Sequence, residues 1–223
     1  MSQMKDLPSD ANLGHVFQRF PKGVDHLLKY HDAVLRGPSE FTIGERELIA
    51  AYVSSLNSCY YCAGVHSVIA ETFGIEVETF QMLIENPDTD TFSSKLSPIL
   101  NYLRKLTLNP SKMLHEDAEA VRTVGWSEDA LFEAISVCAL FSFMHRIVEG
   151  SGLNTSTEAR TATRERHRNG KSDTPYTDFG KRLGIIDLRA KRNRSPLEST
   201  AITYAFPSHP DSEASLRRLA LAN

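Results

Sequence analysis

Residues 42–66 read TIGERELIAAYVSSLNSCYYCAGVH, and this stretch decides the fold. Thr42 and Glu45 have the spacing of a Ser/Thr-x-x-Glu capping box, which predicts that a helix begins here. Asn57 can adopt a left-handed conformation and end that helix, after which Asn57 or Ser58 can cap a second one. The stretch therefore predicts two consecutive helices joined by a short turn.

The second helix carries Cys59, Cys62 and His66, whose spacings of three and four residues place them on one helical face. Cys59 is expected in the first turn, where unpaired N–H groups and the helix dipole lower the pKa of a thiol. His66 directly neighbours Cys62, so we expect His66 to act as its base. Glu47, on the preceding helix, can fold back and orient His66. The pattern predicts a redox or metal site.

Glu47, eleven further residues and the run Cys59-x-x-Cys62-x-x-x-His66 resemble the signature of AhpD-like alkylhydroperoxidases in the carboxymuconolactone decarboxylase superfamily. The sequence of residues 42–54 is similar to the peroxidase-related branch. The resemblance covers about residues 17–153 and implies an all-α AhpD-like helical bundle that assembles as a trimer or hexamer. It also implies that Cys62 is oxidised by a hydroperoxide, and that Cys59 supplies a proton and then closes the disulfide.

One position departs from this pattern. The best-known members have a histidine just before the second cysteine, and this chain has Tyr61. A phenol is a poor base near pH 7, so we expect Cys59 to be less readily activated and turnover to be weak. The residues alone leave the order of attack open, because Cys59 lies nearer the helix N-terminus whereas Cys62 lies nearer His66.

The same residues suggest other kinds of site. A structural zinc ion would have four ligands in Cys59, Cys62, His66 and Glu47. Closed zinc sites usually join separated segments, and here one helix would supply three ligands. Attachment of a c-type haem requires a histidine directly after the second cysteine, where this chain has Ala63. Two cysteines that merely pack as small apolar residues are a further alternative. We expect no cofactor and no bound metal.

The composition sets bounds on partners and location. A chain of 223 residues with a net charge of −3 suits one domain, or a domain with an arm, and does not demand nucleic acid. No uninterrupted apolar run approaches 18 residues and Met1 to Asn12 is polar, so we expect neither a membrane span nor a secretory signal. We expect a cytoplasmic protein that meets a hydroperoxide substrate and a dithiol reductant, such as a lipoylated protein.

Helical periods separated by glycine and proline dominate the chain. Gly74 and Gly125 are placed to end helices, Pro87 and Pro110 follow helix ends, and Ser127 can cap the longest helix. The expected helices are 13–19, 24–36, 43–56, 58–73, 76–85, 95–107, 115–124 and 128–149. The last of these carries Cys138 and His145. Cys138 is expected to be inert core, and His145 a core or interface residue; alternatively, this helix packs behind the active site and helps to hold it.

The composition changes after Leu153. Residues 154–194 carry eleven lysines and arginines against five acidic residues. We therefore divide the chain into an AhpD-like domain, 1–153, and a basic C-terminal arm, 154–223. Apolar patches at 183–188 and 201–206 indicate that the arm docks on the oligomer, across a neighbouring subunit. A solvated tail and a nucleic-acid arm are the alternatives, and the second lacks the aromatic interleaving typical of such arms.

Three classes of function remain. The favoured one is a thiol-dependent peroxidase with a Cys-x-x-Cys dithiol cycle and a Glu/His proton relay. The second is a carboxymuconolactone decarboxylase-like lyase, a branch that does not depend on a cysteine pair. The third is a non-catalytic redox sensor, which would keep the cysteines without turnover.

Overall fold

The computed structural model describes residues 3–85, 95–153, 157–169 and 172–186. These residues form ten α-helices and one short 3-10 helix, and no strand occurs among them. The helices are α1 (Leu13–Arg19), α2 (Val24–Arg36), α3 (Ile43–Leu56), α4 (Tyr60–Thr72), α5 (Val77–Glu85), α6 (Leu96–Leu108), α7 (His115–Thr123), α8 (Glu128–Ser151), α9 (Thr157–Asn169) and α10 (Pro175–Arg182). The predicted all-α class is confirmed.

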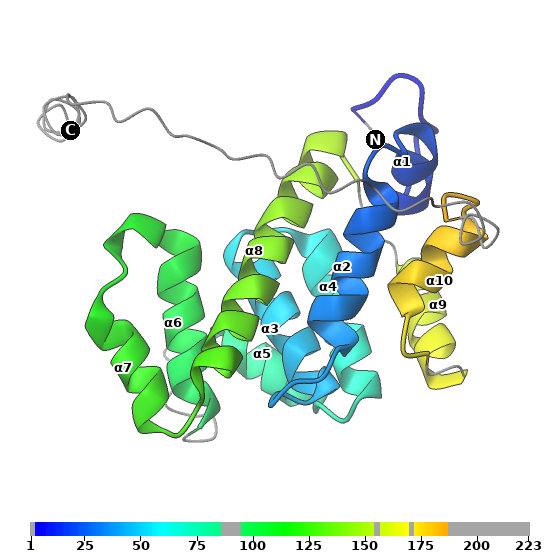
Figure 1. Ribbon diagram of the computed structural model, residues 1–223. Helices are drawn as coiled ribbons and strands as arrows, with labels where there is room; N and C mark the ends of the chain where they lie inside the picture. The colour runs from blue at the N-terminus through cyan, green and yellow to red at the C-terminus, as the bar shows by residue number, and fades with distance from the viewer. Residues whose placement is uncertain (1–2, 86–94, 154–156, 170–171, 187–223) are drawn as a thin grey trace, which may run out of the picture. The chain divides into compact units, whose positions relative to one another are not determined.

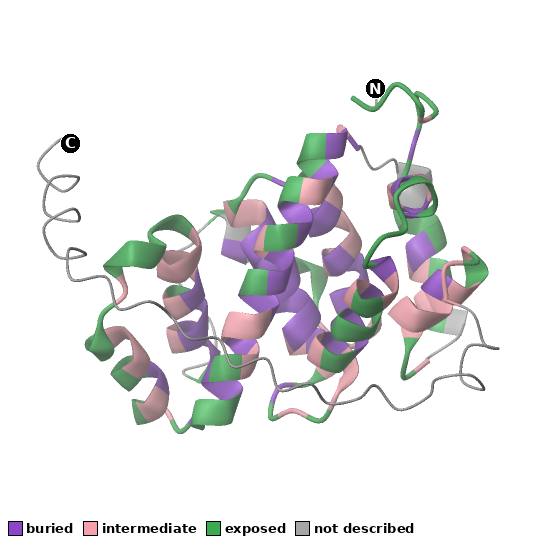
Figure 2. Ribbon diagram, turned by 45° about the horizontal axis from the view of Figure 1, so that its top comes forward, coloured by how far each residue is buried: buried purple, intermediate pink, exposed green. Residues whose placement is uncertain are grey.

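Helix α3 lies at the centre of the bundle. It packs against α4, α8, α6 and α5, and its residues 48–51 are completely buried. Most of its other residues are buried as well, including the charged Arg46 and Glu47. Figure 1 shows α6 and α7 on one side of α8, with α2 and α10 on the other. Buried residues gather along the helix sides that face the interior (Figure 2).

Helix α8 is the longest of the described helices, with 24 residues. By length and composition alone it is apolar enough to cross a membrane, but half of its most apolar stretch is buried inside the protein. It packs against α3, α6, α2 and α7, as a core helix does. Val137 and Val148 on its buried side are fully covered.

The predicted caps at the ends of several helices are confirmed. Thr42 and Glu45 form the expected capping box, and the Ser127 side chain accepts from the Ala130 N–H at the start of α8. Gly74 and Gly125 have positive φ angles of 93° and 90°, the conformation expected of glycines that end helices.

The turn between α3 and α4 differs from the prediction. Ser58, with φ of 56°, adopts the left-handed conformation, whereas Asn57 has φ of −90° and ends α3 without it. Cys59 is the N-cap of α4 and its side chain makes no capping hydrogen bond. The placement of Cys59 within the first turn was therefore wrong by one position, because the chain reverses at Ser58 and the helix begins at Tyr60.

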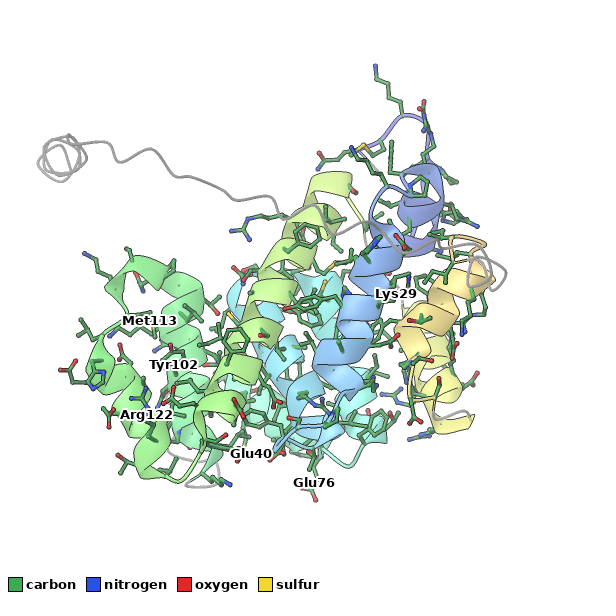
Figure 3. The ribbon with its side chains drawn as sticks, in the orientation of Figure 1. Lys29, Glu40, Glu76, Tyr102, Met113 and Arg122 are labelled. Carbon is green, nitrogen blue, oxygen red and sulfur yellow. The ribbon has the colours of Figure 1, made fainter. Side chains whose placement is uncertain are left out.

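Surface ion pairs close the corner formed by α6, α7 and the start of α8. Arg122 on α7 pairs with Glu119 and with Glu128 (Figure 3). Lys105 on α6 lies 2.6 Å from Asp117 on α7. Exposed pairs of this kind contribute little stability each.

Two helices occur after Leu153, where none was expected. Helix α9 packs against α4, and α10 packs against α2 of the same chain. At Gly64 on α4, a Cβ would lie 3.1 Å from Arg160 of α9; at Gly180 on α10, it would lie 2.7 Å from Leu28 of α2. The absence of a side chain at both glycines permits these close approaches.

Helix α10 is fixed in place by a carboxylate of α2. Asp32, which is nearly buried, accepts hydrogen bonds from the backbone N–H groups of Tyr176 at 3.0 Å and Thr177 at 2.7 Å. A carboxylate at a helix N-terminus satisfies unpaired N–H groups and interacts favourably with the helix dipole. Asp32 thereby caps α10 from another helix and sets the position of Tyr176.

The proposed boundary at Leu153 and the docking of the arm on a neighbouring subunit stay predictions. The compact unit that contains every described residue runs from Met1 to Asp187. The apolar patch at 201–206, and the end of the patch at 183–188, lie outside the described residues.

Candidate active site

A cavity of about 360 Å³ lies among α1, α2, α4, α8, α9 and α10. Cys62 and His66 of α4 form part of its wall. The remaining wall is mostly apolar and includes Leu28 and Phe141. Tyr176 of α10 also lines it, so residues of the C-terminal helices complete a cavity that begins at the cysteine motif.

Glu47 is completely buried beside this cavity at the centre of what we call the carboxylate cluster. Its Oε2 lies 2.5 Å from Nδ1 of His66, and its Oε1 lies 2.6 Å from Nη2 of Arg36. The Tyr176 hydroxyl donates to Oε1 at 3.3 Å. Four helices, α2, α3, α4 and α10, thus contribute one side chain each to this cluster.

The charge state of the carboxylate cluster follows from these contacts. Burial alone would raise the pKa of Glu47, but the Arg36 guanidinium and His66 hold that pKa down at about 2. Because an ionised carboxylate only accepts, Nδ1 of His66 carries the proton of this hydrogen bond. In the neutral ring Nε2 then holds the free lone pair, as the expected orienting role of Glu47 requires.

The His66 ring is also held by aromatic packing. The His66 ring and the Phe141 ring of α8 pack edge to face, with centroids 4.5 Å apart and planes at 82°. On the same cavity wall, His31 of α2 lies 5.0 Å from the Tyr176 ring, measured between centroids. Burial lowers the pKa of His31 to about 4, so this imidazole is neutral near pH 7.

Cys59, Cys62 and His145 form a second group, the sulfur cluster. Each offers one atom, a sulfur or a ring nitrogen, and the three atoms all lie within 4.8 Å of one another. Both cysteines are free thiols; Cys59 is 0% exposed and Cys62 is 4% exposed. Cys62 lines the cavity, whereas Cys59 is not among the lining residues. A molecule in the cavity therefore meets Cys62 first.

The two thiols are hydrogen-bonded to each other. The pKa of Cys62 is raised above its usual value, first because its thiol hydrogen-bonds Cys59 and second because the residue is buried. Interacting groups of this kind titrate as a pair rather than singly. For Cys62 to become a nucleophile, its thiol proton must pass to a base.

The His66 imidazole and the Cys62 thiol are not joined by the direct hydrogen bond that was expected. The described hydrogen bonds include none between them, although both side chains line the same cavity. Nor does the four-ligand zinc set come together, since Glu47 pairs with His66 and with Arg36. The imidazole beside both sulfurs belongs to His145.

His145 is 4% exposed and has one satisfied nitrogen. Its Nε2 lies 2.8 Å from the Ser54 hydroxyl oxygen, and that hydroxyl donates its own proton to the Ala50 carbonyl at 2.7 Å. The hydroxyl must then accept from His145, which places the proton on Nε2 and the lone pair on Nδ1. Nδ1 is buried without a hydrogen-bond partner. Burial lowers the pKa of His145 to about 4, so the ring is neutral near pH 7.

No motif or spacing in the sequence assigned several residues to the site. Arg36 ends a helix and was not distinguished from a surface residue, and Tyr176 lies in the segment interpreted only as a basic arm. His145 was singled out, but no spacing in the sequence connects it to cysteines that lie about eighty residues earlier. Its alternative interpretation, on a helix behind the active site, agrees with where the structure places it.

No family model matches the sequence, and no curated protein matches it either. Two solved structures share its fold. One is an uncharacterized peroxidase-related protein from Silicibacter sp. TM1040, with a TM-score of 0.62 and 20% identity over 67% of this chain and 78% of that chain. The other is described as an alkylhydroperoxidase AhpD core, an uncharacterized peroxidase-related protein from Ralstonia eutropha JMP134.

The Ralstonia protein has a TM-score of 0.62 and 21% identity over 67% of this chain and 79% of that chain. At these identities the likeness shows the fold. The predicted AhpD-like helical bundle is therefore confirmed, and the chain combines this fold with two adjacent buried thiols.

Proposed function

We propose that the protein is a thiol-dependent peroxidase that reduces hydroperoxides through Cys62 and Cys59. The observation that carries the proposal is the arrangement of the two free thiols. Cys62 lies on the cavity wall, and the Cys59 sulfur lies within 4.8 Å of the Cys62 sulfur. A nucleophile that a substrate can reach, with a second thiol within reach of it, is what a dithiol cycle requires.

The proposed reaction has two chemical steps. The Cys62 thiolate attacks the terminal oxygen of the hydroperoxide, the O–O bond breaks, and the departing alkoxide takes a proton to become an alcohol. Cys62 is then a sulfenic acid. The Cys59 sulfur attacks the sulfenic sulfur, a disulfide forms, and water leaves. A dithiol reductant, such as a lipoyl group, returns two electrons and two protons to restore both thiols.

His66 and Glu47 have the proposed role of a proton relay. Glu47 occupies Nδ1 of His66, and the His66 ring lines the cavity, so Nε2 is the nitrogen left to accept a proton. The Cys62 proton moves to His66 through a molecule in the cavity, and Glu47 stabilises the imidazolium that forms. An adjacent base and its orienting carboxylate activate nucleophiles in this manner.

The cavity favours an organic hydroperoxide as the substrate class. Its volume of about 360 Å³ is large compared with the roughly 30 Å³ that one water molecule occupies, so it exceeds the needs of hydrogen peroxide. Leu28, Phe141 and Met144 offer an apolar wall to an alkyl group. The assembly into a trimer or hexamer and the cytoplasmic location belong to this proposal as well.

Stopped-flow oxidation of the reduced full-length protein tests the proposal. We expect alkyl hydroperoxides to convert Cys59 and Cys62 to an intramolecular disulfide, and dihydrolipoamide to support many turnovers. The Cys138→Ser variant is the control and should behave as the wild type, because Cys138 lies in the core beside Thr107. Thiols that stay reduced would overturn the proposal. A single oxidation without turnover would favour the redox sensor instead.

A further inference from the structure

The sulfur cluster brings together the two thiol sulfurs and a ring nitrogen of His145, whose Nδ1 is buried without a hydrogen-bond partner. We propose that Cys59, Cys62 and His145 form a binding site for a thiophilic divalent cation of the zinc class, with its fourth coordination position open to the cavity. This inference stands independently of the proposed peroxidase activity, because it concerns only the reduced thiols and His145.

The first argument is the state of His145. A metal ligand needs a nitrogen lone pair, and the Ser54 hydroxyl already fixes the proton on Nε2. Nδ1 is left with its lone pair, buried and without a hydrogen-bond partner. Metal-bound histidines typically donate their other N–H to a protein oxygen, which orients the ring, and Ser54 supplies that oxygen here.

The second argument is geometry. In a tetrahedral site with Zn–S near 2.3 Å and Zn–N near 2.0 Å, ligand atoms lie roughly 3.5 to 3.8 Å apart. The three atoms of the sulfur cluster lie within 4.8 Å of one another. Small side-chain rotations of the two cysteines are enough to close the remaining difference.

The third argument is ligand chemistry. Two thiolates and an imidazole favour a borderline or soft cation over magnesium or calcium, which prefer oxygen ligands. The two thiols each release a proton when they bind, so a divalent cation and two thiolates make a neutral unit. Neutrality suits a site in which Cys59 and Cys62 are almost wholly buried, because an uncompensated charge is costly there.

The fourth argument is access. Cys62 lines the cavity, so a cation can reach the cluster from that side, and the coordination position facing the cavity can hold water or a small ligand. A bound cation also occupies both sulfurs. Metal binding and disulfide formation are therefore mutually exclusive states of the same pair.

The test is a titration of the reduced full-length protein with Co²⁺ under anaerobic conditions, followed by displacement with Zn²⁺. We expect the intense visible bands of tetrahedral Co²⁺ and a near-ultraviolet thiolate-to-cobalt charge-transfer band. Both should vanish when Zn²⁺ is added, and both should be absent from the disulfide form. A protein that gives neither band when reduced overturns the proposal.

His145→Gln is the decisive variant. The glutamine amide can still donate to Ser54 as Nε2 does, but it replaces the imidazole nitrogen with a carbonyl oxygen, a ligand that suits harder cations. We expect Zn²⁺ affinity, measured against a chromophoric chelator, to fall by at least about 100-fold, since even the loss of an outer hydrogen bond costs 10–100-fold. His66→Gln is the matched control and should retain the affinity, because His66 contacts Glu47 instead.

Equal affinity in the wild type and His145→Gln would overturn the assignment, as would an equal loss in His66→Gln. Far-ultraviolet circular dichroism and thermal melting check that each variant is folded. If His145→Gln does not fold, Ser54→Ala provides a second test: it removes the group that fixes the His145 tautomer and should weaken Zn²⁺ about 10–100-fold. Unchanged affinity in Ser54→Ala would then count against the site.

Discussion

The carboxylate cluster and the sulfur cluster lie beside the same cavity but differ in charge and in hydrogen bonding. In the carboxylate cluster, the buried charge of Glu47 contacts Arg36, His66 and Tyr176. In the sulfur cluster, two thiols are hydrogen-bonded to each other and one buried nitrogen has no hydrogen-bond partner. The first cluster is held together by charged contacts, whereas the second retains the unshared electron pairs that chemistry requires.

This difference has an energetic consequence. Breaking a buried ion pair by removal of one partner typically costs about 3–5 kcal/mol, because a buried charge is left uncompensated. Replacing a buried thiol with a hydroxyl leaves no charge behind. Substitutions in the carboxylate cluster should therefore lower both stability and rate, whereas substitutions in the sulfur cluster should lower mainly the rate.

The sharpest test of this contrast is at the sulfurs. Cys62→Ser should reduce the rate of reaction with hydroperoxide to the background, because no thiol then faces the cavity. Cys59→Ser should still react and should accumulate a sulfenic acid on Cys62, detected by dimedone labelling and mass spectrometry. Normal reactivity of Cys62→Ser would reverse the assignment and make Cys59 the nucleophile.

The next largest effect is expected at His66. His66→Ala should slow the oxidation of Cys62 near neutral pH by about 10²–10⁴-fold, as loss of a general base typically does. The deficit should shrink at alkaline pH, where the thiol ionises unaided. His115→Ala, at an exposed histidine on α7, is the control and should keep the wild-type rate. A pH-independent deficit would remove His66 from the proton relay.

At Glu47 the rate effect should be milder than at His66, but stability should fall. Glu47→Gln keeps the shape and leaves the buried Arg36 without its counter-charge, so the free energy of unfolding should drop by about 3–5 kcal/mol. The double variant with Arg36→Met should recover part of this loss. Urea unfolding at neutral pH measures both changes.

The same variant tests the pH dependence. The pKa of Glu47 is about 2 in the folded protein against 4.5 for an ordinary glutamate, so its ionisation stabilises the fold above pH 4.5. That contribution is lost as the pH falls from 4.5 through about 2. The stability difference between wild type and Glu47→Gln should shrink over this range, and a constant difference would contradict the assignment.

How much the sequence could predict differs between the two clusters. The cysteine motif and the capping box are local patterns, so they predicted α3, α4 and the pairing of Glu47 with His66. Cys59 was misplaced by one position because several residues in the turn can adopt the left-handed conformation, and the sequence does not say that Ser58 does so.

The partners that complete each cluster could not be predicted. His145 meets the cysteines only because α8 packs across α3. Tyr176 meets Glu47 only because Asp32 caps α10 and Gly180 permits its close approach to α2. Such contacts depend on tertiary packing between distant segments, which neither periodicity nor motif spacing contains.

The smallest expected effect concerns this tertiary contact of α10. Tyr176→Phe removes the hydroxyl that donates to Glu47 at 3.3 Å but keeps the aromatic ring beside His31. Because Glu47 retains Arg36 and His66, the free energy of unfolding should fall by only about 1 kcal/mol, the usual net value of one hydrogen bond. Tyr60→Phe, at a residue that is 77% exposed, is the matched control and should cost nothing measurable.

Chemical denaturation measures the cost of Tyr176→Phe, and the rate of Cys62 oxidation provides the second readout. The rate should change far less than in His66→Ala, because the hydrogen bond between Glu47 and His66 remains. A rate loss as large as that of His66→Ala would show that the Tyr176 hydroxyl takes part in the proton relay. The carboxylate cluster would then take part in proton transfer itself, and the contrast with the sulfur cluster would fail.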